Sequence, residues 1–308
     1  MTGSRLGAIR IALSAAALAS SIVAEAADTD LAALRALDAQ VVAVGHRLVG
    51  ANAARCARTV ALAGLALHDV SQYAPRARAK AERLFGFGEA PAVLAIAPTS
   101  AGYAAGLRAD DLLLAVGGVP IERVERAGGR ASNELSMRVL GALQAAAAAG
   151  PFSLTIERGG IPHELLVAPE RACGDRIELV PATRLSARAD GATIQVSSAM
   201  AAFAGDPDSL AVVLAHELAH SILGHETRRR AAKRVRADEI EADALSLTLM
   251  TDAGFDPHAA ARFWTRYGAA EGRRRAASTH PGWRDRAAFL AAEAARLSGQ
   301  RAAAPQRP

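Results

Sequence analysis

The stretch DPDSLAVVLAHELAHSILGH, residues 206–225, constrains the fold more than any other part of this chain of 308 residues. It begins like a helix: Asp206 can cap the first turn, Pro207 suits the first helical position, and Asp208 favours the positive end of the helix dipole. The positions that follow are almost all apolar. We therefore predict a helix that is buried on most sides, with these residues in the core: Leu210, Val213, Leu214, Leu218 and Ile222.

Two histidines and a glutamate interrupt this apolar run. Residues four apart on a helix lie on the same face, so His216 and His220 can present ring nitrogens to one metal ion, with Glu217 beside them. The pattern His-Glu-x-x-His on a helix is a signature of zinc hydrolases, because imidazoles suit zinc and the adjacent carboxylate can deprotonate a water. The alternative is a pair of core histidines satisfied by hydrogen bonds.

A second helix is predicted over residues 235–250, VRADEIEADALSLTLM. Zinc hydrolases need a third protein ligand and one open position for water. Glu239 and Asp243 share a face of this helix, whereas Glu241 points elsewhere. The helix thus offers a carboxylate to the same metal ion.

The run His-Glu-x-x-His at 216–220, followed by Glu-Ile-Glu-Ala-Asp at 239–243, resembles the gluzincin metallopeptidases of the Ste, HtpX and Oma type. This is the superfamily of the CAAX prenyl protease, and it includes a BepA-like periplasmic group. The resemblance implies one Zn²⁺ per chain, with Glu239 as its third protein ligand. It further implies that Asp243 orients a ligand histidine and that Glu217 is the general base.

A late element, THPGWRDR at 279–286, resembles the His-Pro-x-x-x-x-Arg element of the same family. It implies that His280 and Arg286 lie near the site, where either could stabilise an oxyanion. His280 has two alternatives: a fourth zinc ligand in a latent state, or a surface histidine before a proline. His225 could line the site, but a role at the helix end is favoured.

Residues 178–200 resemble the strand pair that precedes the motif helix in this family, with a hairpin at Asp190-Gly191. The resemblance implies that an extended substrate lies beside residues 192–197. Ser186 stands where many members have asparagine.

The middle of the chain has a different character. Residues 84–121 alternate short apolar runs with turns, 132–148 predict a helix, and a hairpin is expected around Gly159-Gly160. This segment resembles a bacterial PDZ domain, with the helix beside its groove. The resemblance implies that a chain terminus binds at the carboxylate-binding loop, which is assigned to Leu84, Phe85, Gly86 and Phe87. The alternative is a β-rich insert without a ligand.

The predicted fold class is α+β: a mainly helical gluzincin metallopeptidase domain with a small sheet, plus a β-rich PDZ domain. An amphipathic helix is expected over 28–55 and a strand over 58–70. The expected divisions are a signal peptide (1–26), the first part of the peptidase domain (27–83), the PDZ domain (84–170), the peptidase domain (171–298) and a disordered tail (299–308).

Export is expected because residues 1–26 combine Arg5 and Arg10 with an uncharged run and a small-x-small cleavage site. In an oxidising compartment, two cysteines more often form a disulfide than act as nucleophiles. We therefore predict a bridge between Cys56 and Cys173, which would join the two ends of the inserted domain.

The net charge of +5 does not indicate a nucleic-acid partner, because the basic residues are spread along the chain without aromatic interleaving. The arginine runs at 227–236 and 272–278 are interpreted as solvated segments, or as peripheral contacts with an anionic membrane.

The sequence therefore predicts a zinc-dependent endopeptidase that acts on exported or envelope proteins, in quality control or processing, with substrate termini bound by the PDZ domain. The alternative is a PDZ-mediated peptide-binding or chaperone-like protein with a latent or silent zinc site. Prenyl-protease action is disfavoured, because no predicted membrane helices surround the site.

Overall fold

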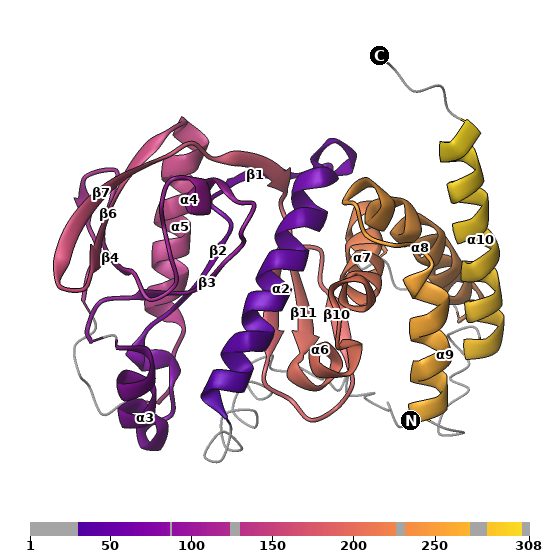
Figure 1. Cartoon of the computed structure of the whole chain (residues 1–308), viewed down its shortest axis with the longest axis horizontal. Helices are drawn as coiled ribbons and strands as arrows, with labels where there is room; N and C mark the ends of the chain where they lie inside the picture. The colour runs from indigo at the N-terminus through magenta and orange to yellow at the C-terminus, as the bar shows by residue number, and fades with distance from the viewer. Residues whose placement is uncertain (1–29, 87, 124–129, 226–231, 272–281, 304–308) are drawn as a thin grey trace, which may run out of the picture.

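The computed structural model describes residues 30–86, 88–123, 130–225, 232–271 and 282–303. The expected signal peptide and His280 lie outside these residues. The chain combines helices and sheets, which confirms the α+β class. Figure 1 shows a sheet-rich unit and a helical unit on either side of one long helix, α2 (Leu31–Ala51). No helix in the described ranges is long and apolar enough to cross a membrane.

The helical unit is built around α7 (Pro207–Leu223), which contacts α2 on one side and α8 on the other. A small sheet with the strand order β10-β11-β9 packs against it. The other elements of this unit are α6 (Ser198–Ala204), α8 (Ala232–Asp252), α9 (Ala259–Glu271), α10 (Trp283–Ala303), β9 (Arg176–Val180), β10 (Ala187–Ala189) and β11 (Thr193–Ser197).

Helix α7 forms as its sequence predicts. The Asp206 carboxylate accepts a hydrogen bond from the Ser209 N–H at 2.9 Å, and Gly224 ends the helix in the left-handed conformation at φ 65°. Ten of its residues are buried, so the helix runs through the core. The polar residues of the motif are consequently held among apolar neighbours.

The sheet-rich unit contains a sheet of order β2-β3-β4-β6-β7, in which β5 also pairs with β4. The hairpin at Gly159-Gly160 joins β6 to β7, as predicted. The elements are β2 (Leu65–His68), α3 (Pro75–Phe85), β3 (Ala92–Ile96), α4 (Ala101–Ala104), β4 (Leu112–Val116), β5 (Val119–Pro120), α5 (Glu134–Ala149), β6 (Phe152–Arg158) and β7 (Ile161–Val167), with short 3₁₀ turns at Ala53–Arg55 and Val70–Gln72.

The single strand expected over 58–70 is in fact two strands. Strand β1 (Thr59–Leu62) pairs with β8 (Glu170–Cys173), whereas β2 joins the sheet of the other unit. Gly64 separates them at φ 75°, where a Cβ atom would lie only 2.2 Å from the Ser100 Cβ. The sheet thus begins at residue 65, before the boundary expected at residue 84.

Two of the residues assigned to the carboxylate-binding loop belong to a helix in the structure. Leu84 and Phe85 are the last residues of α3, Gly86 is its left-handed cap, and Phe87 lies outside the described residues. The Phe85 ring is 5% exposed and packs on His68 at 5.0 Å between ring centroids. The start of the run assigned to the loop is therefore the end of an amphipathic helix, in which Phe85 is buried and Leu84 is exposed.

The segment expected as a disordered tail is partly helical. Helix α10 continues to Ala303, so residues 299–303 are helical, which fits the high helix propensity of glutamine, arginine and alanine in this segment. Residues 304–308 lie outside the described part.

The disulfide between Cys56 and Cys173 is present, with a Cα–Cα distance of 5.4 Å. Cys173 also pairs with Thr59 in the β1–β8 ladder. The bridge therefore closes the two crossings between the helical unit and the sheet-rich unit.

We expect the double variant Cys56→Ala, Cys173→Ala to lose about 2–5 kcal/mol of unfolding free energy, because the unfolded chain would no longer be cross-linked. Denaturant titration measures the loss, and reduced wild-type protein, which still has both cysteines, is the control. Two free thiols in the mass spectrum of non-reduced wild-type protein would contradict the bridge.

His68 is a buried base at the end of β2. Its Nδ1 lies 2.8 Å from the Tyr73 hydroxyl, and the residue is 1% exposed. Burial, together with the charge of Arg35, lowers its pKa to about 3. Because the unfolded chain takes up this proton near pH 6.5 and the folded chain does not, stability falls as the pH drops below 6.5.

The lowered pKa of His68 makes the unfolding free energy of the wild type about 2 kcal/mol smaller at pH 5 than at pH 8. We expect His68→Asn to show a smaller difference in unfolding free energy between pH 8 and pH 5, measured by urea titration at both values. Comparing the same variant at two pH values cancels most of the lost packing. An unchanged pH difference would show that His68 is not the group responsible.

Candidate metal centre

Helices α7 and α8 lie side by side (Figure 1) and bring three predicted ligands together. The Nε2 atoms of His216 and His220 are 3.1 Å apart. Glu239 faces both rings, with its carboxylate oxygens 3.4 Å from His216 Nε2 and 3.5 Å from His220 Nε2. These three side chains form a cluster able to hold a metal ion.

The spacing of these donors fits a tetrahedral zinc site. Zinc lies about 2.0–2.1 Å from histidine nitrogen and carboxylate oxygen, so neighbouring ligand atoms of a tetrahedron are about 3.3 Å apart. The observed separations of 3.1–3.5 Å bracket that value. Two facing imidazole nitrogens beside a carboxylate, buried together, are otherwise costly to hold in place.

The electrostatics of the cluster also favour a cation. Burial and Arg286 lower the pKa of His216, but hydrogen bonds to Asp243 and Glu239 outweigh them and raise it to about 9. Burial and the neighbouring His216 lower the pKa of His220 to about 4. The carboxylates of Asp243 and Glu239 thus stabilise positive charge at His216, and a metal ion bound there would replace the proton of that ring.

Asp243 lies directly behind the cluster, where its Oδ1 atom is 3.0 Å from His216 Nδ1. Arg286 donates two hydrogen bonds to the same carboxylate, from Nε at 2.7 Å and from Nη2 at 2.6 Å. The guanidinium carbon in turn lies 3.4 Å from the centre of the Trp264 ring. Burial raises the pKa of Asp243, but these hydrogen bonds hold it below its usual range. Asp243 is thus a fixed anion that orients His216.

Arg286 was expected as an oxyanion donor, but its contacts are different. The residue is 5% exposed, and its guanidinium is engaged with Asp243, His216 and Trp264. The family resemblance of residues 279–286 predicts that Arg286 lies near the site, but it does not predict which groups its guanidinium contacts. The second candidate donor, His280, lies outside the described residues.

Glu217 and Glu241, the two other glutamates near the cluster, differ in burial and in position. Glu217 is half-buried on α7, next to His216. The Glu241 side chain is 61% exposed and lies 3.6 Å from His225 instead of facing the cluster. For His225 the sequence favours a helix-end role over lining the site, yet its Nδ1 lies 3.0 Å from His220 Nδ1. The feature of the sequence that could have indicated this contact is the position of His225 directly after the glycine cap of α7.

The position expected for a substrate, beside residues 192–197, is occupied by protein. Strand β11 lies between β10 and β9, so both of its edges are already paired. The edge strand next to α7 is β10. The carbonyl of Ser186, just before β10, accepts a hydrogen bond from the Ser197 N–H, and the Ser186 N–H donates to the Ser197 hydroxyl oxygen.

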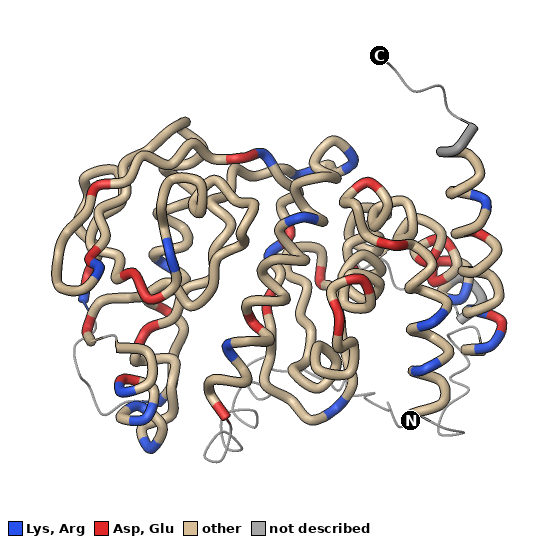
Figure 2. The backbone as a smooth tube through the Cα atoms, in the orientation of Figure 1, with Lys and Arg blue, Asp and Glu red and all other residues tan. Residues whose placement is uncertain are grey.

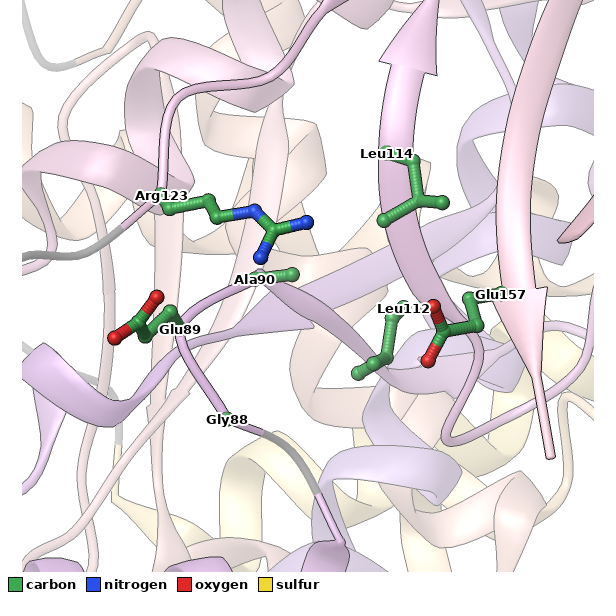
Figure 3. A pocket seen from close by; sticks show the side chains of 7 residues that line it. All are labelled: Gly88, Glu89, Ala90, Leu112, Leu114, Arg123 and Glu157. Carbon is green, nitrogen blue, oxygen red and sulfur yellow. The ribbon is translucent and has the colours of Figure 1, made fainter. Parts of the chain in front are cut away.

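The sheet-rich unit contains a separate cavity of about 300 Å³ (Figure 3). Leu112 and Leu114 form its apolar wall, and the charged side chains of Glu89, Arg123 and Glu157 surround it. It shares no residue with the metal cluster. Over the described chain, both units contain basic and acidic residues (Figure 2).

Three comparisons place these residues among known proteins. Residues 230–294 match the sequence model described as Peptidase family M48, a segment that includes Glu239, Asp243 and Arg286 but begins after the two histidines. The mitochondrial metalloendopeptidase OMA1 of Schizosaccharomyces pombe (strain 972 / ATCC 24843) is 34% identical over 24% of this chain and 33% of its own length. The chain therefore spans about a third of that relative.

Among solved structures, the crystal structure of the HtrA3 PDZ domain bound to a phage-derived ligand (FGRWV) matches 37% of this chain and 89% of that chain. The sequence identity is 20% and the TM-score 0.26, which is too low to support an argument about the fold. The sequence matches, by contrast, show that residues 230–294 are similar to peptidase family M48 and that part of the chain is similar to a metalloendopeptidase, which supports metallopeptidase activity.

Proposed function

We propose that this protein is a zinc-dependent endopeptidase in which His216, His220 and Glu239 hold one zinc ion. The observation that carries the proposal is the convergence of two imidazoles and one carboxylate from two helices, with ring nitrogens and carboxylate oxygens 3.1–3.5 Å apart. This donor set leaves a fourth position for water or substrate, as catalytic zinc sites require.

When bound, zinc would lower the pKa of a water molecule and polarise the carbonyl group of the scissile peptide bond. Glu217 accepts the proton of that water as the new C–O bond forms. It then delivers the proton to the leaving amine nitrogen as the C–N bond breaks. Asp243 and Arg286 keep the His216 ring in place throughout.

The substrate, in this proposal, is an extended polypeptide beside β10. An edge strand offers backbone N–H and C=O groups to an added strand, and β10 is the edge strand that contacts α7. Pairing of this kind is largely independent of side chains, so it suits an enzyme that acts on unfolded segments of many proteins.

We place this activity outside the cytoplasm, on exported or envelope proteins, as in the BepA-like group that the sequence resembles. The support is the signal-like segment 1–26 together with the disulfide, which is typical of oxidising compartments. Quality control or processing of such proteins is the expected role.

Peptide binding without cleavage is the second candidate. The observation that favours it is the edge strand β2, which lies beside α5 in the sheet-rich unit. An edge strand beside a helix is the arrangement in which PDZ domains add a peptide to their sheet. In a peptidase, this unit would present substrate termini. In a binding protein, it would be the whole function.

Removing a ligand tests the zinc site. We expect His216→Ala, His220→Ala and Glu239→Gln each to lower zinc affinity at least about 100-fold, and Asp243→Asn to lower it about 10- to 100-fold. Competition with a coloured chelator measures the affinity. Glu134→Gln, the same change on an exposed helix position, should have no effect; four ligand-cluster variants with unchanged affinity would rule out this site.

Removing the base tests the chemistry. We expect Glu217→Gln to retain one zinc per chain but to cleave unfolded casein at least about 100-fold more slowly than the wild type, because general-base catalysis is lost. Peptide release and metal content are measured on the same samples. A zinc-loaded wild type that binds peptides but cleaves none would favour the binding-protein alternative.

A further inference from the structure

His225 is a buried histidine that the proposed chemistry does not use. It follows the left-handed cap Gly224, and its N–H donates to the His220 carbonyl at 3.0 Å. This turn folds the ring back against the end of α7, where its side chain is only 6% exposed. Its Nδ1 atom lies 3.0 Å from His220 Nδ1.

The other nitrogen of His225 faces two carboxylates of α8. Its Nε2 lies 3.8 Å from Asp238 Oδ1 and 3.6 Å from Glu241 Oε2. Asp238 is buried, whereas Glu241 reaches into solvent. Both belong to the helix turn that also provides Glu239, so His225 connects the ligand-bearing ends of α7 and α8.

The chemistry of imidazole fixes the direction of the contact between the two rings. A neutral imidazole has one N–H and one lone pair. When His220 gives its Nε2 lone pair to a metal, its proton must be on Nδ1. The facing nitrogen of His225 then has to accept, and the proton of His225 must be on Nε2, which points toward Asp238 and Glu241.

We propose that His225 is a positioning residue of the metal centre: it accepts a hydrogen bond from His220 Nδ1 and thereby fixes the tautomer and ring orientation in which His220 Nε2 binds zinc. Asp238 and Glu241 hold the complementary tautomer of His225. This inference rests on the proposed zinc site. A histidine here takes the place that carboxylates or backbone carbonyls usually have behind a metal-bound histidine.

The same three side chains, His225, Asp238 and Glu241, could instead form a second metal site. A metal on His225 Nε2 would move that ring's proton to Nδ1. With zinc on His220 Nε2, two N–H groups would then face each other across 3.0 Å. Occupation of both sites would break the observed contact, so the geometry favours the positioning role.

Two substitutions separate the hydrogen bond from the mere presence of a side chain. Asn can place an amide oxygen near the position of the His225 Nδ1 atom and accept from His220, whereas Gln extends its amide toward the position of Nε2. We expect His225→Gln to lower zinc affinity about 10- to 100-fold, and His225→Asn to restore most of that loss. Chelator competition measures zinc affinity, and thermal unfolding of the metal-free proteins measures folding.

Equal losses of affinity in the two variants, or no loss in either, would overturn the proposal, because the accepting atom would then be irrelevant. Two zinc ions per wild-type chain and one in both variants would overturn it in favour of a second metal site. A wild type that binds no zinc would refute the metal centre itself, and with it this inference, before any variant is compared.

Discussion

The contact between α7 and α8 is the constraint on which the rest of the molecule depends. It buries two imidazoles against the carboxylates of Glu239 and Asp243, groups that are costly to remove from water unless each is compensated. The imidazoles and carboxylates compensate one another through their contacts, and Arg286 neutralises Asp243. A bound dication would complete the balance. These charges face one another only when α7 and α8 pack in this register. The buried charges therefore favour this packing, and this packing forms the site.

The two histidines of the proposed metal centre are supported in different ways. Three side chains lie in series behind His216. The Asp243 carboxylate contacts its ring and accepts hydrogen bonds from Arg286, and the Trp264 ring covers the Arg286 guanidinium. Behind His220 stands His225, another imidazole. The His216 ring is held by the negative charge of Asp243. The contact that holds the His220 ring depends on which nitrogen of each imidazole carries a proton. Both supports include residues of α8, so displacement of that helix would disturb both ligands together.

The sheet-rich unit is attached to this centre by α2 and by the two crossings at β1 and β8. Arg35 on α2 donates to the Leu94 carbonyl at 3.1 Å and pairs with Asp110 at 2.8 Å. On its other side, α2 packs on α7 and β9. The disulfide lies at the crossings, where the chain leaves and re-enters the helical unit. The sheet-rich unit is therefore held to the helical unit through the packing of α2 and through a covalent bridge.

The sequence by itself determined the elements whose signals are local. The cap, the apolar spacing and the glycine end of α7 specify that helix, and four-residue spacing places His216 with His220 and Glu239 with Asp243. Compartment chemistry was sufficient to pair the two cysteines. Tertiary structure decided what depends on partners far apart in the chain. Gly64 sends β1 and β2 to different sheets, Phe85 is a core residue and not part of a loop, Arg286 turns toward Asp243, and His225 reaches His220. Spacing along one element fixes which side chains share a face, but the direction in which a long or turn-borne side chain points is set by the charges and surfaces that other elements bring to it.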